Sequence, residues 1–470
     1  MTGGAYALTD RLGIQYTSRP YLPDDTSMST SQLQDSVDLI IKARWIVPVV
    51  PANKVFEDCA LVIDQGKILA LVPQQEAERR FTADQIIELP HHLLTPGFIN
   101  AHCHAAMNLF RGFADDQPLH QWLHESIWPA EKRWLSDDFV RDGSELAAAE
   151  MIQSGISCFS DMYFFPEETA QVCLDVKLRC QLSFPVMDFP TAWGTGADDY
   201  MAKGLALHDN FRNSELINIA FGPHAPYTVS DSILRRIAIL AQEMDMPVQI
   251  HLHETAQEII DSLKNYNKRP SQRLMDLGLL FPLTQCVHMT QIDDTDIALL
   301  QNSGASVIHC PESNLKLASG FCPVQKLLNA GINVAIGTDG AASNNDLSLL
   351  GELKTAALLA KAVAQDASAL NAHTALRMAT LNGAMALGLE DKIGSLEIGK
   401  SADITAIDLS HLHAQPIYDP VSQLIYSQSA QQVSHLWVNG ECLLSEGKLQ
   451  TLDEKELKAK ANFWRDKIAN

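Results

Sequence analysis

The chain lacks several patterns by which large classes of protein are recognised. It contains nine cysteines among 470 residues but no Cys-x-x-Cys pair. Scattered cysteines of odd number in a long chain are typical of reduced thiols, so we expect a cytoplasmic protein without a disulfide framework. No run approaches the roughly 18 apolar residues of a membrane span, and the first 35 residues lack the apolar stretch of a secretory signal. We therefore expect no membrane partner.

Basic residues are scarce relative to acidic ones. The 35 lysines and arginines are outnumbered by 57 aspartates and glutamates, which gives a formal net charge of −22. No lysine or arginine cluster is present that would follow a phosphate backbone, so nucleic acid is excluded as a partner. The acidity favours solubility instead, and a hydrophobic content of 46% provides material for a sizeable core.

Short β-rich zones lie near both ends of the chain. The first zone has apolar segments at residues 39–47, 60–64 and 68–72, and a glycine-containing turn at residues 65–67 joins the last two. The second zone, at residues 394–407 and 433–442, repeats the strand–turn–strand pattern. Neither zone alone has enough strands for a stable sheet. We therefore expect both ends to form one small, β-sandwich-like domain.

This composite domain would comprise residues 36–94 and 394–450. Residues 1–35 are polar and are predicted to form an irregular extension. Residues 451–470 are rich in glutamate and lysine, which predicts a final amphipathic helix.

Between the two zones, eight strand-like runs alternate with helix-like stretches. The runs are residues 97–104, 157–164, 180–188, 217–224, 247–254, 285–289, 306–311 and 333–339. Intervening stretches such as 139–153 and 231–243 carry apolar residues at helical spacing. This alternation predicts an α/β fold, a (β/α)8 TIM barrel, over residues 95–393. A doubly wound open sheet is the alternative, but it predicts a glycine-rich phosphate turn after the first strand, which is lacking.

Metal-ligating residue types recur where the predicted strands end. In His102-Cys103-His104, the two histidines face the same way on a strand, so both imidazoles can bind one cation, while Cys103 points to the opposite face. The other such residues are His224, His251, His253, Glu254, His288, His309 and Asp339. A single histidine is more often an ordinary core or surface residue. The chain has 16 histidines, and seven of them lie at predicted strand ends. This concentration favours one shared site, because the active sites of such barrels lie at the C-terminal ends of the strands.

Imidazoles combined with a carboxylate indicate hydrolytic chemistry. Three imidazoles, one carboxylate and an open position suit a catalytic Zn²⁺, with Fe²⁺ or Mn²⁺ chemically tolerable. Such an ion activates water near neutral pH, and the reaction then needs a base and an acid. Asp339 suits the first task and Glu254 the second. The alternative for Glu254 is a helix N-terminal acid stabilised by the helix dipole, because residues 255–258 begin a helix.

Four motifs resemble those of the amidohydrolase superfamily and, within it, the deaminase and chlorohydrolase group. They are Pro96–His104, Phe221–Tyr227, His251–Thr255 and Gly337–Asn345. Residues 394–403 are similar to a segment of the small domain of these proteins, and the resemblance extends from residue 39 to about residue 449. It implies a metal-dependent hydrolase on a TIM barrel.

The resemblance also implies roles for individual residues. The implied metal ligands are His102, His104, His251 and Asp339. Glu254 resembles the residue that passes protons to a ring nitrogen, and His288 resembles the one that orients the attacking hydroxide. His224 stands where binuclear members have a carbamylated lysine, which implies a single metal ion.

Within the group, the chain is most similar to deaminases of 5′-methylthioadenosine and S-adenosylhomocysteine. This implies hydrolysis of an adenine nucleoside at C6, with Glu131 gripping the ribose hydroxyls and His224 contacting the purine or ribose. Without the resemblance, Glu131 would be interpreted as a solvated helix acid. Further wall candidates for the thioether or the base are Met107, Leu109, Phe110, Trp122, Trp128 and Trp193. A homo-oligomer is the default expectation for such an enzyme.

Other hydrolases on the same scaffold are the nearest alternatives. These are a guanine, 8-oxoguanine or pterin deaminase and an s-triazine chlorohydrolase, whose substrates have no ribose for Glu131 to bind. A non-catalytic scaffold barrel is a more remote alternative, since such proteins typically lose their metal ligands. The cytidine-deaminase type of zinc site requires a Pro-Cys-x-x-Cys motif, which the chain lacks.

Overall fold

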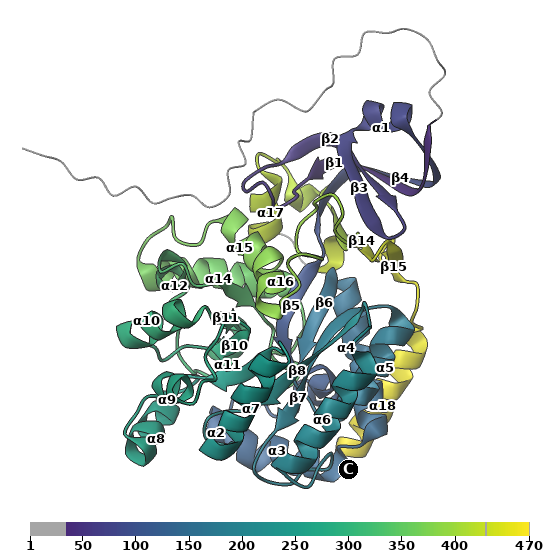
Figure 1. Ribbon diagram of the computed structural model, residues 1–470. Helices are drawn as coiled ribbons and strands as arrows, with labels where there is room; N and C mark the ends of the chain where they lie inside the picture. Colours follow the sequence, from purple (N-terminus) through teal and green to yellow (C-terminus); the bar gives the residue numbers. More distant parts are fainter. Residues whose placement is uncertain (1–33, 428–429, 470) are drawn as a thin grey trace, which may run out of the picture.

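Two eight-stranded sheets organise the chain, as seen in a computed structural model that describes residues 34–427 and 430–469 (Figure 1). One sheet is a parallel barrel, and the other lies at one end of the molecule with the short helix α1 (Gln74–Arg80). The predicted TIM barrel with a second sheet from both chain ends is confirmed. The predicted extension lies outside the described residues except for residues 34 and 35. Within the described ranges, no helix is long and apolar enough to cross a membrane.

The barrel strands follow one another in chain order and are all parallel. They are β5 (Phe98–Cys103), β6 (Ile156–Asp161), β7 (Arg179–Val186), β8 (Ile217–Pro223), β9 (Val248–Leu252), β10 (Thr284–His288), β11 (Ser306–His309) and β12 (Val334–Ile336). Nearly every residue of these strands is buried, because the barrel interior covers one face and helices cover the other. This explains why the strands read as continuous apolar runs in the sequence.

The barrel closes where the segment after β12 meets β5. The Thr338 amide donates to the His102 carbonyl at 3.1 Å, and Cys103 and Asp339 form a parallel bridge. A Cβ atom at Gly337 would lie 2.9 Å from the His102 backbone nitrogen, so this close approach requires glycine. Closure therefore brings the eighth strand's carboxylate beside the first strand's histidines.

Helices connect the strands and surround the barrel (Figure 1). The main ones are α4 (Asp137–Gln153), α5 (Pro166–Val176), α6 (Ala197–Phe211), α7 (Asp231–Glu243), α8 (Ala256–Tyr266), α10 (Asp294–Ser303), α14 (Leu349–Ala364), α15 (Ala372–Met378) and α16 (Leu381–Leu387). After β5, the shorter segments η1 (Ala105–Phe110), α2 (Leu119–Gln121), η2 (Trp122–Ile127) and α3 (Trp128–Trp134) precede α4. These short segments lie above the C-terminal ends of the strands and form one wall of the cavity described below.

The second sheet is built from both ends of the chain. Its strands are β1 (Asp35–Ile46), β2 (Phe56–Asp64), β3 (Lys67–Pro73), β4 (Phe81–Pro96), β13 (Ile404–Asp408), β14 (Val433–Val438), β15 (Glu441–Ser445) and β16 (Lys448–Leu449). The two halves meet because β4 pairs with β1 in parallel and with β13 antiparallel. Side chains from both ends, including Ile41, Leu61, Ile404 and Trp437, share one buried core. Residues 394–400 form turns, and β13 begins only at Ile404.

Polar contacts link the barrel to the rest of the chain. Arg179 at the start of β7 pairs with Asp403 at 3.1 Å, and both side chains are almost fully buried. The final helix, α18 (Glu454–Ala469), lies along α4, where the Trp464 indole donates to Asp142 at 2.8 Å (Figure 1). These contacts hold the barrel against the segment that leads into β13 and against the final helix.

Candidate active site

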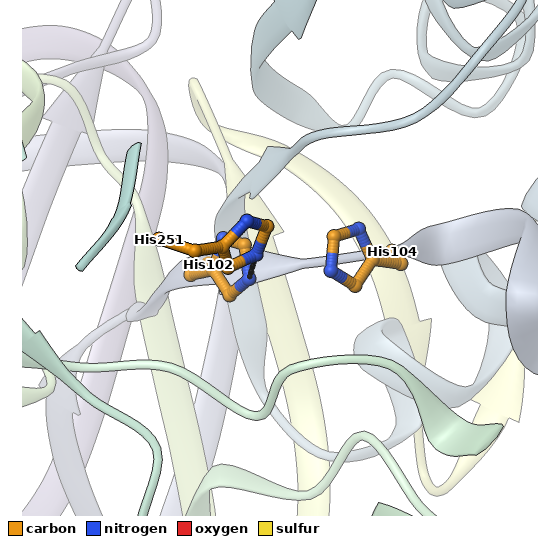
Figure 2. Close-up of side chains that lie close together, drawn as sticks. All are labelled: His102, His104 and His251. Atoms are coloured by element: carbon orange, nitrogen blue, oxygen red, sulfur yellow. Dashed lines mark hydrogen bonds between the residues drawn. The ribbon is translucent and has the colours of Figure 1, made fainter. Parts of the chain in front are cut away.

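Three histidines converge at the C-terminal end of the barrel. His102 lies in β5, His104 follows that strand directly, and His251 lies in β9. One ligand-capable atom from each lies within 4.8 Å of the others, and the Nε2 atoms of His102 and His251 are 3.2 Å apart. Figure 2 shows the His102 and His251 rings close together, with the His104 ring facing them. Three imidazoles arranged in this way suit one transition-metal ion.

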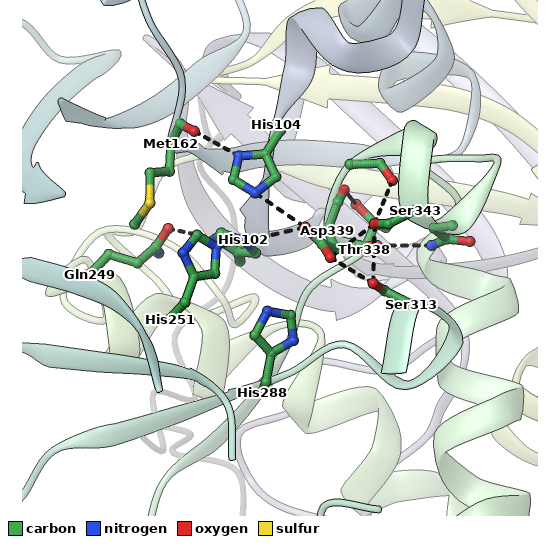
Figure 3. A network of polar contacts seen from close by, with 12 residues as sticks. His102, His104, Met162, Gln249, His251, His288, Ser313, Thr338, Asp339 and Ser343 are labelled. Carbon is green, nitrogen blue, oxygen red and sulfur yellow. Dashed lines mark hydrogen bonds and ion pairs between the residues drawn. The ribbon is translucent and has the colours of Figure 1, made fainter. Parts of the chain in front are cut away.

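Hydrogen bonds at the far side of each ring prepare the three histidines for metal binding. Each Nδ1 lies 2.6–2.8 Å from an oxygen. The partners are Gln249 Oε1 for His102 and the Met162 carbonyl for His104 (Figure 3), and the His224 carbonyl for His251. Because these oxygens accept, each Nδ1 carries the proton and donates it. Each Nε2 then keeps its lone pair for an ion.

Asp339 adds an oxygen to the three nitrogens. Its Oδ1 lies 3.2 Å from His104 Nε2 and 3.5 Å from His102 Nε2, and its Oδ2 accepts hydrogen bonds from Ser313 and Ser343 at 2.6 and 2.9 Å (Figure 3). Burial opposes ionisation, but the close polar contacts with His102 and His104 outweigh it and hold the pKa of Asp339 well below its usual value. An ionised carboxylate beside three imidazoles fits the donor set of a divalent ion such as zinc.

His288 and Glu254 face each other beside this cluster. His288 Nδ1 lies 2.9 Å from Asn314 Oδ1, so this nitrogen donates, and Nε2 points toward Glu254 Oε2 at 3.8 Å. Burial first, and the charge of Asp339 second, raise the pKa of Glu254 to about 8, whereas a hydrogen bond from Ser319 lowers it. Glu254 is therefore protonated at neutral pH and can serve as a general acid.

A cavity lies above these groups, and together with the open solvent at its mouth the space measures about 770 Å³. His104, His251, His288, Glu254 and Asp339 form its polar floor. The apolar part of its lining consists of Met107, Leu119, Trp122, Leu123, Ile127, Trp128, Met162, Phe164, Pro185, Met187 and Leu317. The cavity thus combines a reactive end with an apolar wall.

Glu131 carries a carboxylate into this cavity. The Tyr163 hydroxyl donates to Glu131 Oε1 at 2.7 Å, and both residues contribute to the lining. Burial raises the pKa of Glu131 to about 7, while the Tyr163 hydrogen bond lowers it. Glu131 was open to interpretation as a solvated helix acid, but here it is a partly buried acceptor that lines the cavity. His224 also lines the cavity, with Nδ1 3.1 Å from the Thr228 hydroxyl.

Trp193 requires a correction, because it is absent from the lining of this cavity. Its indole donates to the carboxylate of Glu167 at 3.1 Å and stacks on Tyr200 of α6, with 5.7 Å between ring centres. The loop after β7 thus turns Trp193 toward the helical layer and away from the barrel mouth. Phe110 of η1 is likewise not part of the lining and packs on Phe139.

Two strand-end histidines also lie apart from the cluster. His253 Nε2 accepts from the Ser271 amide at 3.0 Å, and its Nδ1 bonds the Gln291 carbonyl, so both ring nitrogens are used structurally. His309 is fully buried, and neither of its ring nitrogens has a hydrogen-bond partner within the described part of the chain. The strand-end pattern therefore included two histidines that the structure does not bring to the cluster.

Several residues of the site were missed from the sequence. Tyr163 follows the end of β6 by two residues, and Tyr227 follows the Gly222-Pro223-His224 turn, so both lie at the barrel edge where site residues are expected. Gln249 precedes His251 by two residues and therefore shares its face of β9. Position relative to strand ends was the available signal for the two tyrosines but not for Gln249, which lies near the start of β9.

Comparison with known proteins agrees with this geometry. The Amidohydrolase family model matches residues 93–443. A protein of Saccharophagus degradans called 5-methylthioadenosine/S-adenosylhomocysteine deaminase is 57% identical over 92% of this chain and 97% of its own length. The crystal structure of an adenosine deaminase from Xanthomonas campestris with bound zinc is 47% identical, with a TM-score of 0.92 over 93% of this chain and 100% of its own.

A more distant structure shows the fold alone. An atrazine chlorohydrolase from Arthrobacter aurescens complexed with zinc has a TM-score of 0.85 at 23% identity, covering 91% of this chain and 99% of its own. The family model spans the barrel and its ligand-bearing strand ends, and the deaminase relative covers almost the whole chain. The chain therefore belongs to the amidohydrolase family.

Proposed function

We propose that this chain removes the 6-amino group of adenine nucleosides by hydrolysis, with 5′-methylthioadenosine as its principal substrate. S-adenosylhomocysteine and adenosine are further candidate substrates. The observation that carries the proposal is the placement of Glu254 and Glu131 in one cavity, where a protonated acid lies beside the histidine cluster and a second carboxylate lies among apolar side chains. The printed names of the Saccharophagus and Xanthomonas relatives support the same reaction.

A single divalent metal ion, Zn²⁺, would be held by His102, His104, His251 and Asp339. Fe²⁺ and Mn²⁺ accept the same donors. The family is metal-dependent, and zinc is bound in the Xanthomonas relative. Among the described residues, this is the one group of three or more close ligand side chains, which supports one ion rather than two. When bound, the ion would supply a Lewis acid that makes water nucleophilic near neutral pH.

The protein's own groups then move the protons. Asp339 would take the proton from the attacking water, while His288 Nε2 orients this water toward C6 of the adenine. Glu254 would give its proton to N1 as the ring accepts the oxygen at C6, so that charge does not build up on the ring. The proton held by Asp339 then passes to the amino group. As the C6–N bond breaks and ammonia leaves, the C6 hydroxyl returns its proton to Glu254 and becomes the carbonyl of the product. One water is consumed for each hypoxanthine nucleoside formed.

Glu131 and the apolar wall would select the substrate. A carboxylate accepts hydrogen bonds from both hydroxyls of a ribose diol, and Trp122, Trp128 and Met107 offer apolar surface to a methylthio group. The described lining includes three carboxylates but no lysine or arginine. A charged amino-acid tail would find no cation there, so we expect 5′-methylthioadenosine to be used better than S-adenosylhomocysteine.

An ammonia-release screen tests the proposal. The panel should contain 5′-methylthioadenosine, adenosine, S-adenosylhomocysteine, guanine, cytosine and a chlorotriazine, each tried with Zn²⁺, Fe²⁺ and Mn²⁺. We expect the highest kcat/KM for 5′-methylthioadenosine and loss of that activity in Glu254→Gln. A higher kcat/KM for guanine, or chloride release from the triazine without deamination of nucleosides, would refute the assignment.

A further inference from the structure

A chain of buried glutamine side chains lies directly beneath the histidine cluster. Gln249 of β9, Gln285 of β10 and Gln181 of β7 are all 0% exposed. Their amides bond one another, from Gln249 Nε2 to Gln285 Oε1 at 2.7 Å and from Gln181 Nε2 to the same oxygen at 2.9 Å. Gln249 Oε1 lies 2.7 Å from His102 Nδ1. The chain of amides therefore ends on a candidate metal ligand.

Two backbone carbonyls fix the direction in which these amides point. A carbonyl oxygen can only accept, and Gln249 Nε2 lies 3.0 Å from the Ala101 carbonyl. The nitrogen of the Gln249 amide must therefore face Ala101, and its oxygen must face His102. At the other end, Gln285 Nε2 donates to the Ala386 carbonyl at 2.9 Å. This turns the Gln285 oxygen toward Gln249 Nε2. The Ala101 and Ala386 carbonyls therefore both require the Gln249 amide to point its nitrogen away from His102.

The orientation of Gln249 determines which nitrogen of His102 carries the proton. Because the Gln249 oxygen accepts, His102 Nδ1 must donate, and Nε2 is left with a lone pair. Nε2 is the atom that lies 3.2 Å from His251 Nε2 and 3.5 Å from Asp339 Oδ1. The other tautomer would place a hydrogen where the ion is expected. Since the His102 ring is fully buried, water does not compete for Nδ1.

We propose that Gln249 is a positioning residue that fixes the tautomer and ring orientation of His102 and thereby strengthens metal binding. The inference rests on the metal site proposed above. Gln285 has a different role. If its side chain is removed, Gln249 Nε2 still has two hydrogen-bond acceptors, the Ala101 carbonyl and the Ser160 hydroxyl, both at 3.0 Å. Gln285 stabilises the barrel interior without being needed to orient His102.

Two matched substitutions separate positioning from stability. Gln249→Met and Gln285→Met each remove one fully buried amide from the same network, so both should lower the urea midpoint of unfolding of the metal-free protein by similar amounts. Loss of a hydrogen-bonded partner behind a ligating histidine typically weakens metal binding by about 10- to 100-fold. We therefore expect zinc affinity, measured by competition with a chromogenic chelator, to fall by that factor in Gln249→Met and by less than about threefold in Gln285→Met.

An equal decrease in zinc affinity in both variants would overturn the proposal. So would a Gln249→Met variant that binds zinc as tightly as the wild type. A wild-type protein that binds no zinc would overturn the metal site itself and this inference with it. A measurement on the metal-free wild type covers the case in which Gln249→Met does not fold. Nitrogen-15 NMR of histidine-labelled protein, assigned with His102→Asn, should show His102 protonated at Nδ1. Protonation at Nε2 would contradict the proposed tautomer.

Discussion

Replacing Glu131 with glutamine should impair the reaction of nucleosides and leave the reaction of the free base unchanged. The substitution keeps the size of the side chain and the oxygen that accepts from Tyr163, but it removes the charge and replaces one acceptor with a donor. Hydrogen bonds to a charged group contribute about 1.5–3 kcal/mol, compared with about 0.5–1.5 kcal/mol for neutral ones. For two ribose hydroxyls, we expect a net loss of about 2–3 kcal/mol.

This free energy corresponds to a decrease of roughly 30- to 160-fold in kcat/KM, since about 1.36 kcal/mol changes a rate tenfold. The assay should be run near pH 8, because burial raises the pKa of Glu131 to about 7 and the carboxylate is mostly ionised only above that value. Steady-state ammonia release from 5′-methylthioadenosine should show the loss, while adenine and 2′,3′-dideoxyadenosine should change by less than about twofold. An equal loss on all three substrates would refute the assignment of Glu131 to the ribose.

Three further predictions follow from the same site. KM for nucleosides should fall as pH rises through about 7, where Glu131 ionises. Tyr163→Phe should move this transition to higher pH, because it removes a hydrogen bond that lowers the pKa of Glu131. A profile of KM against pH that is unchanged in Tyr163→Phe would argue against the contact between Glu131 and the ribose. Glu254→Gln should lower kcat by about 10²- to 10⁴-fold with zinc content unchanged, and near-normal turnover would require a different acid. Gly337→Ala would place a Cβ atom 2.9 Å from the His102 backbone and should lower the free energy of unfolding by about 1–3 kcal/mol, measured by urea denaturation; wild-type stability would show that the barrel seam is not closely packed there.

Periodicity and strand-end chemistry were sufficient to predict the barrel. Continuous apolar runs such as residues 217–224 became strands because both faces of the barrel wall are buried, and the helix predicted at 231–243 has those bounds in the structure. The runs generally extended past the true strand ends. At His288 and Asp339 the backbone takes positive φ angles of 77° and 61°, which end the extended conformation and turn these side chains toward the cavity.

Contacts between distant segments were harder to predict. The seam at Gly337 and the Tyr163–Glu131 hydrogen bond each join residues far apart in the chain, and no local pattern encodes such a pairing. Trp193 was placed in the cavity on the basis of its loop, but the direction of an aromatic side chain depends on partners such as Tyr200. Gln249 was missed because a glutamine within an apolar strand gives no signal until its carbonyl and histidine partners are known.

The central claim is that residues far apart in the chain hold one ion at the mouth of the barrel. A crystal grown with zinc and measured on both sides of the zinc absorption edge tests this claim directly. The account predicts one strong anomalous peak within bonding distance of His102 Nε2, His104 Nε2, His251 Nε2 and Asp339 Oδ1. The absence of a peak between these four atoms at saturating zinc would contradict it.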